Sequence, residues 1–357
     1  MHSTVEILGL GRPAAWLPWA VTYFFLIGVS TASFFLALPG FVWRHPAWRG
    51  MSRQALLAAL VCGLAAPVAL LADLHQPGRF LNFYLHPQAG SWMAWGAFFI
   101  PLYLAGLLLF AWLCLRPQLA QMAQQGGRWA GLYGRLAYGG HEQPGAIRAA
   151  AGLAALGAGL VLLYTGMEVM VVQARSLWHT PILPLLFVVT AFIGALGMIA
   201  LFEAVGGRCP VNTVLIHRWL PRAVQASLGL VALWLVSGLS GLSTPAADAL
   251  AAMQGSFGWW MTGLWWLGSS LLLLWLLRAG PDALALPALL ALHAAWLVRW
   301  IVFIGGQGLP KLGATRPAYF LTLSPDSLLG IVGMAGLCVA IYILLTGFIP
   351  WDDRAEA

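Results

Sequence analysis

The feature that most constrains this chain is its division into about nine apolar stretches, each long enough to cross a membrane as a helix. A spanning helix needs roughly 20 apolar residues, because each residue advances the helix by about 1.5 Å through a hydrocarbon core about 30 Å thick. Charged residues make up only 8% of the 357 residues, whereas a soluble domain carries about 25%. So little charge cannot cover a water-facing surface. The stretches are 16–42, 54–73, 92–115, 149–173, 181–205, 223–241, 256–278, 283–306 and 325–349.

Turn-forming and helix-breaking residues separate these stretches, for example Gly126-Gly127 and Gly280-Pro281. The sequence therefore predicts an all-α integral membrane protein of about nine transmembrane helices. The first stretch starts about 15 residues into the chain, without a basic leader or a small-residue cleavage site. We therefore expect it to be a retained helix and not a cleaved signal peptide.

The basic residues predict the orientation of the chain, because short cytoplasmic loops are enriched in Lys and Arg. The odd-numbered connections hold eleven such residues and the even-numbered connections hold four. The odd connections should therefore be cytoplasmic, with the N-terminus outside and the C-terminus inside. The formal charge of +7 has the same origin and does not indicate nucleic-acid binding, because no loop clusters Lys and Arg with interleaved aromatic residues.

The sequence offers little to hold a redox centre. Its four cysteines contain no C-x-x-C pair, so neither an iron–sulfur cluster bound by this chain alone nor a disulfide framework is expected. Only His293 lies well inside a stretch, whereas a b-type haem in a helical bundle needs two histidines on facing helices. We therefore expect neither haem nor bound metal. The chain also lacks a nucleotide-binding P-loop, which excludes a nucleotide-driven pump.

The ionisable residues at membrane depth are the candidates for a functional site. A charged group at the centre of a membrane helix costs at least about 2.5–3.5 kcal/mol, so each such group needs a partner or a purpose. Asp73 ends the second stretch at its outer face, and His75 and Arg79 follow closely. A local ion pair between Asp73 and Arg79 is the alternative, purely structural interpretation.

Three further residues reach the same depth near the outer surface. Glu168 lies about 9 Å below the outer end of the fourth stretch at 1.5 Å per residue, and Tyr164 precedes it by one helical turn on the same face. Tyr23 falls in the outer third of the first stretch. The alternative interpretation of Tyr23 is an interfacial anchor. Glu168 is harder to explain structurally, because it is a lone carboxylate in an apolar run.

Glu203, His293 and Arg299 are further ionisable residues inside the stretches. Glu203 comes near the inner end of the fifth stretch, where we expect it to face water at the membrane edge. His293 and Arg299 share the eighth stretch and indicate a second polar seam. A packed interhelical network and a proton path both account for that seam.

Three segments resemble the NrfD/PsrC family, the polysulfide reductase-type membrane anchors that interact with quinol. Residues 71–83, LADLHQPGRFLNF, resemble the family's DLGRPxRFxNF turn. Residues 163–166, LYTG, and 176–187, SLWHTPILPLLF, are similar to its YTG…PLWNSPLLPLLF stretch, and residues 299–307, RWIVFIGGQ, to its RYVxxxGGQ segment. His75 stands where the family usually has Gly, and a ninth stretch follows the last segment. These departures most resemble the membrane subunits of the tetrathionate reductase branch.

The resemblance implies both an architecture and a function. It implies an N-terminal bundle with a quinol site in residues 1–180, of four helices, and a second bundle with the extra ninth helix in residues 181–357. Family members sit in the bacterial inner membrane, oxidise menaquinol or ubiquinol, and pass two electrons to a four-cluster iron–sulfur subunit and then to a molybdopterin catalytic subunit. The terminal substrate belongs to that catalytic subunit.

Carried onto this chain, the resemblance places the quinol beside Asp73, His75, Arg79, Tyr164 and Glu168, and Tyr23 joins them by its depth alone. We expect His75 or Asp73 to hydrogen-bond the quinol and accept the first proton. Tyr164 should hold one quinol oxygen, and Glu168 should pass protons onward. Two other functions remain open, a purely structural membrane anchor and a secondary transporter, which would show internal repeats and helices broken near the midplane.

Overall fold

The helices of the computed structural model match the apolar stretches. The structure describes residues 14–74, 76–207, 209–280, 284–309 and 319–349, together with Trp351. Within that part of the chain no strand occurs, and nine segments are long and apolar enough to cross a membrane, which confirms the prediction. These segments are α1 (Pro18–Phe41), α2 (Arg49–Asp73), α4 (Trp92–Gln125), α6 (Pro144–Met170), α7 (Ile182–Gly206), α8 (Pro210–Leu239), α10 (Phe257–Arg278), α11 (Ala285–Trp300) with α12 (Gly306–Gly308), and α13 (Leu328–Phe348).

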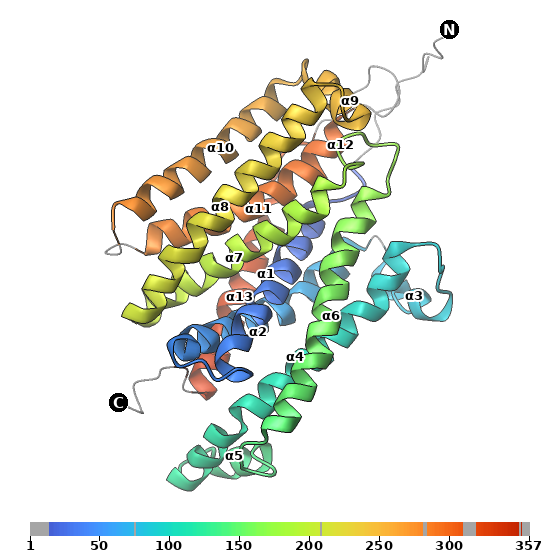
Figure 1. Ribbon diagram of the computed structural model, residues 1–357. Helices are drawn as coiled ribbons and strands as arrows, with labels where there is room; N and C mark the ends of the chain where they lie inside the picture. The colour runs from blue at the N-terminus through green and yellow to red at the C-terminus, as the bar shows by residue number, and fades with distance from the viewer. Residues whose placement is uncertain are drawn as a thin grey trace.

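Short elements connect the long helices. A π-helical turn (Ile301–Gly305) joins α11 to α12 within the eighth span. The connections also contain α3 (Asn82–Leu85), α5 (Ala130–Leu136), α9 (Thr244–Met253) and the 3-10 turns Pro46–Trp48 and Pro77–Arg79. Helices α9 and α12 lie toward one end of the bundle and α5 lies at the opposite end (Figure 1).

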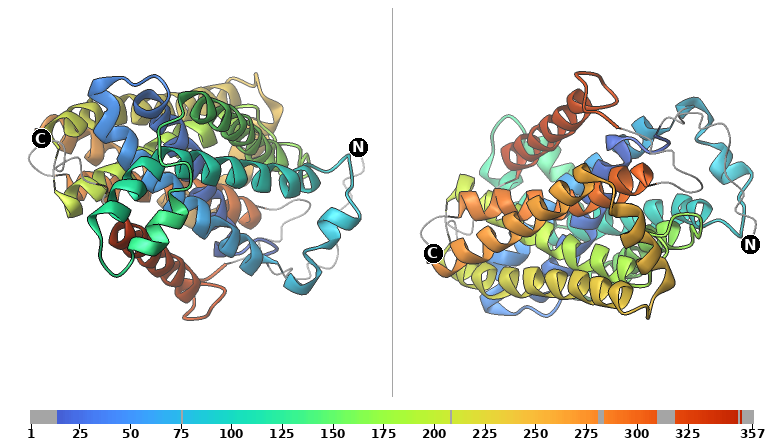
Figure 2. Two further views of the ribbon diagram at one scale, coloured as in Figure 1. Left: turned by 90° about the horizontal axis from the view of Figure 1, so that it is seen from below. Right: turned by 90° about the horizontal axis from the view of Figure 1, so that it is seen from above.

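Helix α1 is the centre of the bundle. Its most apolar window is 83% buried, and it contacts α2, α6, α7, α11 and α13. The pair α4–α6 packs on one side of this centre, and α8 and α10 lie on the other (Figures 1 and 2). The ninth span, α13, contacts α2 and α1, so the last helix of the chain packs against the first two.

Glycines bring α4 and α6 into close contact. A Cβ at Gly106 would lie 2.8 Å from the Cα of Ala154, and a Cβ at Gly157 would lie 2.6 Å from the Cα of Tyr103. In lipid no hydrophobic effect drives two helices together, so association depends on packing, which small residues improve by letting backbones approach. These two glycines therefore set the distance between α4 and α6, which carry two walls of the site described below.

A matched pair of glycines on α6 tests this packing. Gly157→Ala is expected to lower stability in detergent by about 1–3 kcal/mol, because the added methyl group meets backbone that cannot move aside. Gly159→Ala meets nothing within 4 Å and should be neutral or stabilising by up to about 1 kcal/mol, as a helical Gly is replaced by Ala. Thermal unfolding of the two purified variants measures the difference. Equal stabilities would contradict the packing argument.

Two helices extend well beyond the stretches predicted for them. Helix α4 continues to Gln125 instead of ending near residue 115, and α8 begins at Pro210 instead of near residue 223. The added turns contain polar residues such as Gln118, Asn212 and His217. Hydropathy marks the part of a helix that lies in hydrocarbon, whereas backbone hydrogen bonding continues past the membrane edge.

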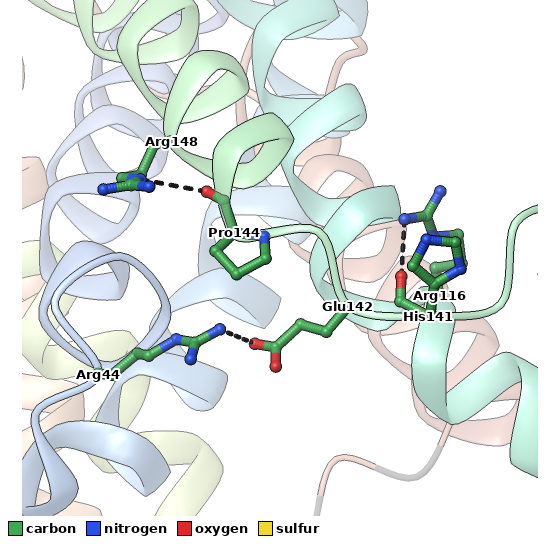
Figure 3. Close-up of polar contacts among 6 residues, drawn as sticks. All are labelled: Arg44, Arg116, His141, Glu142, Pro144 and Arg148. Carbon is green, nitrogen blue, oxygen red and sulfur yellow. Dashed lines mark hydrogen bonds and ion pairs between the residues drawn. The ribbon is translucent and has the colours of Figure 1, made fainter.

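Arginines order the connections at the α5 end of the bundle (Figure 3). The buried Arg116 of α4 donates to the backbone oxygens of Tyr138 and His141, at 3.3 and 2.8 Å. Arg44, just after α1, forms an ion pair with Glu142 at 2.9 Å. Because both side chains of that pair are more than half exposed, the pair contributes at most about 1 kcal/mol. Arg116 contributes more to the structure, because its buried guanidinium supplies the hydrogen bonds that water would otherwise donate to these two carbonyl oxygens.

The expectation that Glu203 faces water is wrong. Its side chain is 2% exposed and accepts hydrogen bonds of 2.7 Å from the backbone N–H of Cys209 and from Nδ2 of Asn212. The early start of α8 causes this, because it places the first turn of that helix against the end of α7. A carboxylate at a helix N-terminus is stabilised by the unpaired N–H groups and the helix dipole there. Glu203 is therefore a buried cap.

Candidate functional site

A cavity of about 620 Å³ lies between α1, α2, α4 and α6. Its walls are mostly apolar, and the turn and short helix that follow α2 contribute Phe80, Phe83 and Tyr84. The lining runs along α4 from Met93 to Leu108, a span of 15 residues, or about 22 Å at 1.5 Å per residue. The cavity is therefore elongated along the helix axes and suits an extended, largely apolar ligand.

The polar residues of the cavity gather at one end. Tyr23, Asp73, Tyr164 and Glu168 all line it, so the structure brings together the four described residues that sequence depth had placed at one level. Tyr164 lies beside both Tyr23 and Glu168. Tyr23 is fully buried, which does not fit the alternative interpretation of an exposed interfacial anchor.

Two polar atoms at this end lack a hydrogen-bond partner among the described residues. They are the hydroxyl of Tyr23 and Oε2 of Glu168, both buried; Tyr164 interacts with both side chains, but no hydrogen bond of standard geometry reaches these two atoms. Burying such a group without a partner costs about 1–3 kcal/mol in proteins. Both residues line the cavity, so a ligand with hydroxyl or carbonyl oxygens at this end would lie beside them. A quinol head group carries oxygens of this kind.

Asp73 has a structural contact as well as a place in the cavity wall. Its Oδ1 accepts a hydrogen bond from the backbone N–H of Leu17, at 3.3 Å, where α1 begins. A carboxylate in that position stabilises the N-terminus of the helix. Asp73 thus joins the end of α2 to the start of α1 and places a carboxylate at the polar end of the cavity.

The other two residues predicted beside Asp73 stand apart from this geometry. Arg79 is exposed in the turn Pro77–Arg79 and is not one of the described residues that line the cavity. His75 lies outside the described residues. Their roles at a quinol site stay predictions.

Gly96 is a residue of the site that sequence reasoning missed. A Cβ at this position of α4 would lie 2.4 Å from Cζ and 2.8 Å from the hydroxyl oxygen of Tyr164. The absence of a side chain at Gly96 therefore makes room for the phenol. In the sequence, Gly96 is the single glycine among residues 92–99, four of which are aromatic. Its role depends on which residue of α6 faces it, and the sequence does not give that residue.

A second cavity, of about 720 Å³, lies between α13 and the helices α1, α2, α7 and α11. Two of its polar residues already have partners. Thr22 donates to the backbone oxygen of Pro18 at 2.9 Å, and Nε2 of His293 accepts from Nε1 of Trp265 at 2.7 Å. These side chains do not require a polar ligand, which makes the first cavity the better candidate site.

In the polar seam of the eighth span, the described contacts of Arg299 form a packed network of hydrogen bonds. Arg299 is 2% exposed and donates to the hydroxyl of Thr190 and to the backbone oxygens of Phe187 and Ala295. The bonds to Thr190 and Phe187 tie α11 to α7. Within the described part of the chain, no group of three or more His, Cys, Asp or Glu residues could hold a metal ion.

Comparison with known proteins agrees with the motifs. The sequence profile of the family "Polysulphide reductase, NrfD" matches residues 7–310, a region that ends before α13. The chain is 34% identical to a subunit of the tetrathionate reductase of Salmonella typhimurium over 354 residues, covering 96% of this chain and 95% of that protein. It is 24% identical to a subunit of the selenate reductase of Mesobacillus selenatarsenatis over 388 residues, covering 99% of this chain and 89% of that protein. The chain is therefore a multi-pass membrane protein that belongs to the NrfD polysulphide reductase family.

Proposed function

We propose that this chain is the quinol-oxidising membrane subunit of a tetrathionate reductase-like respiratory complex. The observation that carries the proposal is the cavity at α1, α2, α4 and α6, with the unpartnered Tyr23 hydroxyl and Glu168 Oε2 at its polar end. The relatives are subunits of tetrathionate and selenate reductases. By analogy, this chain would deliver electrons to an iron–sulfur subunit and a molybdopterin catalytic subunit.

The chemistry assigned to the cavity is the oxidation of quinol, menaquinol or ubiquinol, to quinone with loss of two electrons and two protons. The electrons pass to the peripheral iron–sulfur subunit, and the protons need acceptors within hydrogen-bonding reach. Asp73, or His75 two residues later in the sequence, takes the first proton in this scheme. Tyr164 holds a quinol oxygen, Tyr23 offers a further hydroxyl, and Glu168 passes protons onward.

The orientation predicted from the basic residues belongs to the same proposal. It places the N-terminus in the periplasm, the C-terminus in the cytoplasm, and the polar end of the cavity near the periplasmic surface of the inner membrane. An iron–sulfur subunit bound at that surface would lie close to the quinol head group. The proposed division near residue 180 puts this cavity in the N-terminal bundle, although α1 also packs against α7 and α11 of the second bundle.

Replacing Tyr164 tests the assignment. Tyr164→Phe removes one hydroxyl from the cavity, and the apparent KM for quinol in the purified complex is expected to rise about tenfold, the effect of about 1.4 kcal/mol. Tyr103→Phe is the matched control, because Tyr103 is also fully buried, but its hydroxyl pairs with Ser30 at 2.7 Å and it does not line the cavity. Its KM should stay parental.

Two other results would favour the other functions. A purely structural anchor predicts that the Tyr164 variant oxidises quinol at the parental rate and KM, just as the Tyr103 control does. A secondary transporter predicts substrate uptake into proteoliposomes that contain this chain alone. Either result would contradict the proposed function.

A further inference from the structure

Gln307 joins the end of the eighth span to the residues just before α1. Its Oε1 accepts hydrogen bonds from the backbone N–H groups of Ala15 and Trp16, at 2.8 and 3.0 Å. Its Nε2 donates to the backbone oxygens of Trp16 and Phe303, at 2.8 and 3.0 Å. The side chain is 3% exposed. Both acceptor sites and both donors of the amide are therefore used.

A second side chain holds the next backbone amide. The N–H of Leu17 donates to Asp73 at 3.3 Å. Gln307 and Asp73 thus bind the three consecutive N–H groups of residues 15–17, although they come from the eighth and second spans. These two residues belong to two of the segments that carry the family resemblance, and the structure brings those segments together at the N-terminal side of α1.

The ring of Trp16, whose backbone Gln307 binds, packs against three other aromatic rings. It stacks on Phe303 with ring centres 4.8 Å apart and on Phe24 at 5.7 Å, and it lies 5.7 Å from Trp178. Trp16 also lines the 620 Å³ cavity, whereas Gln307 does not. The hydrogen bonds of Gln307 therefore hold the backbone of a cavity-lining residue from outside the cavity.

Trp178 of the remaining family segment, 176–187, and Arg175 just before that segment fix the part of the eighth span that carries Gln307. Nε1 of Trp178 donates to the oxygen of Val302 at 2.6 Å, and Nη1 of Arg175 donates to the oxygen of Gly306 at 2.9 Å. Gly306 has no room for a side chain, because a Cβ there would lie 2.3 Å from Nε1 of Trp178. The π-helical turn is thus held at a defined position, and Gln307 with it.

We propose that Gln307 is a positioning residue for the quinol cavity, which sets the place of Trp16 in the cavity wall and thereby the affinity for quinol. The inference rests on the proposed function and extends it to a residue outside the cavity. It gives the glutamine of the late segment a role in ligand binding through the N-terminal residues of the chain.

Steady-state kinetics of the intact complex test this role. Gln307→Met keeps the length of the side chain and removes its hydrogen bonds, so the apparent KM for quinol should rise about tenfold, or about 1.4 kcal/mol, while kcat stays within about twofold of the parental value. Trp16→Ala should raise KM at least as much. In the double variant KM should equal that of Trp16→Ala alone, because residues acting through one another are not additive.

Two more variants make the outcome decisive. Gln173→Met makes the same change at an exposed glutamine in the connection after α6 and should leave KM parental. Gln307→Glu, protonated, retains the acceptor oxygen and one donor, and should give a KM between the parental and Gln307→Met values. If Gln307→Met does not assemble, an unchanged KM in Gln307→Glu together with an unchanged KM in Trp16→Ala overturns the inference.

The results separate this inference from the function on which it rests. A parental complex that does not oxidise quinol contradicts the proposed function itself. A parental complex that oxidises quinol, with either unchanged KM in the Gln307 variants or additive effects in the double variant, overturns only the role of Gln307.

Discussion

Replacing Glu168 with glutamine is expected to lower quinol-dependent turnover of the assembled complex about 100-fold. Glutamine keeps the shape of the side chain but cannot take up a proton, and positioned acids and bases contribute about 10²- to 10⁴-fold to proton-transfer steps. Glu168 is buried, lines the cavity and has an unpartnered Oε2. The loss should therefore appear mainly in kcat, with a smaller change in KM.

Two controls separate proton transfer from assembly. An artificial donor that reduces the partner subunits directly should support parental turnover in the Glu168→Gln complex. Glu203→Gln removes another buried carboxylate, one that caps α8 away from the cavity, and should keep quinol turnover in whatever complex assembles. Parental quinol turnover in Glu168→Gln would show that this carboxylate does not carry protons from quinol.

Gly96→Ala should also lower quinol-dependent turnover strongly, by up to about 100-fold, since a displacement of about 1 Å at a reacting group can cost that much. The added methyl group would lie 2.4 Å from the ring of Tyr164, so the phenol must move. Stability should fall as well, by about 1–3 kcal/mol, because the cavity end is overpacked.

A second substitution distinguishes these two effects of Gly96→Ala. Adding Tyr164→Leu removes the ring that the methyl group meets, so the melting temperature should recover toward that of Tyr164→Leu alone. Turnover should not recover, because the hydroxyl is also gone. Recovery of both quantities would mean that Tyr164 has no part in the reaction, and recovery of neither would place the clash elsewhere.

The sequence predicts the spans well because lipid imposes a simple rule. Every backbone polar group in hydrocarbon must be satisfied internally, so an apolar stretch of sufficient length is a helix. The same rule predicts the depth of Tyr23, Asp73, Tyr164 and Glu168 in the membrane, because each residue of a spanning helix advances it by about 1.5 Å. That these residues line one cavity also requires their helices to be neighbours, which depth alone does not establish.

What the sequence could not predict depends on contacts between distant helices. Gly96 matters because Tyr164 faces it, and Gln307 matters because residues 15 and 16 pass beside it. The water-facing position expected for Glu203 was wrong for a related reason, since the first turn of α8 covers it. Hydropathy describes how each residue meets lipid or water, and it carries no information about which neighbour a side chain finds.

The bond between Gln307 and Ala15 joins residues that are 292 positions apart. Because the chain is made from its N-terminus, Trp16 is synthesised early. Its hydrogen bonds to Gln307 can form only after the eighth span has entered the bilayer. Until then the four helices that surround the cavity can already be inserted, while the backbone of residues 15 and 16 still lacks its hydrogen bonds to Gln307. The order of synthesis thus leaves an interval during biogenesis in which the cavity lacks the bonds that position Trp16.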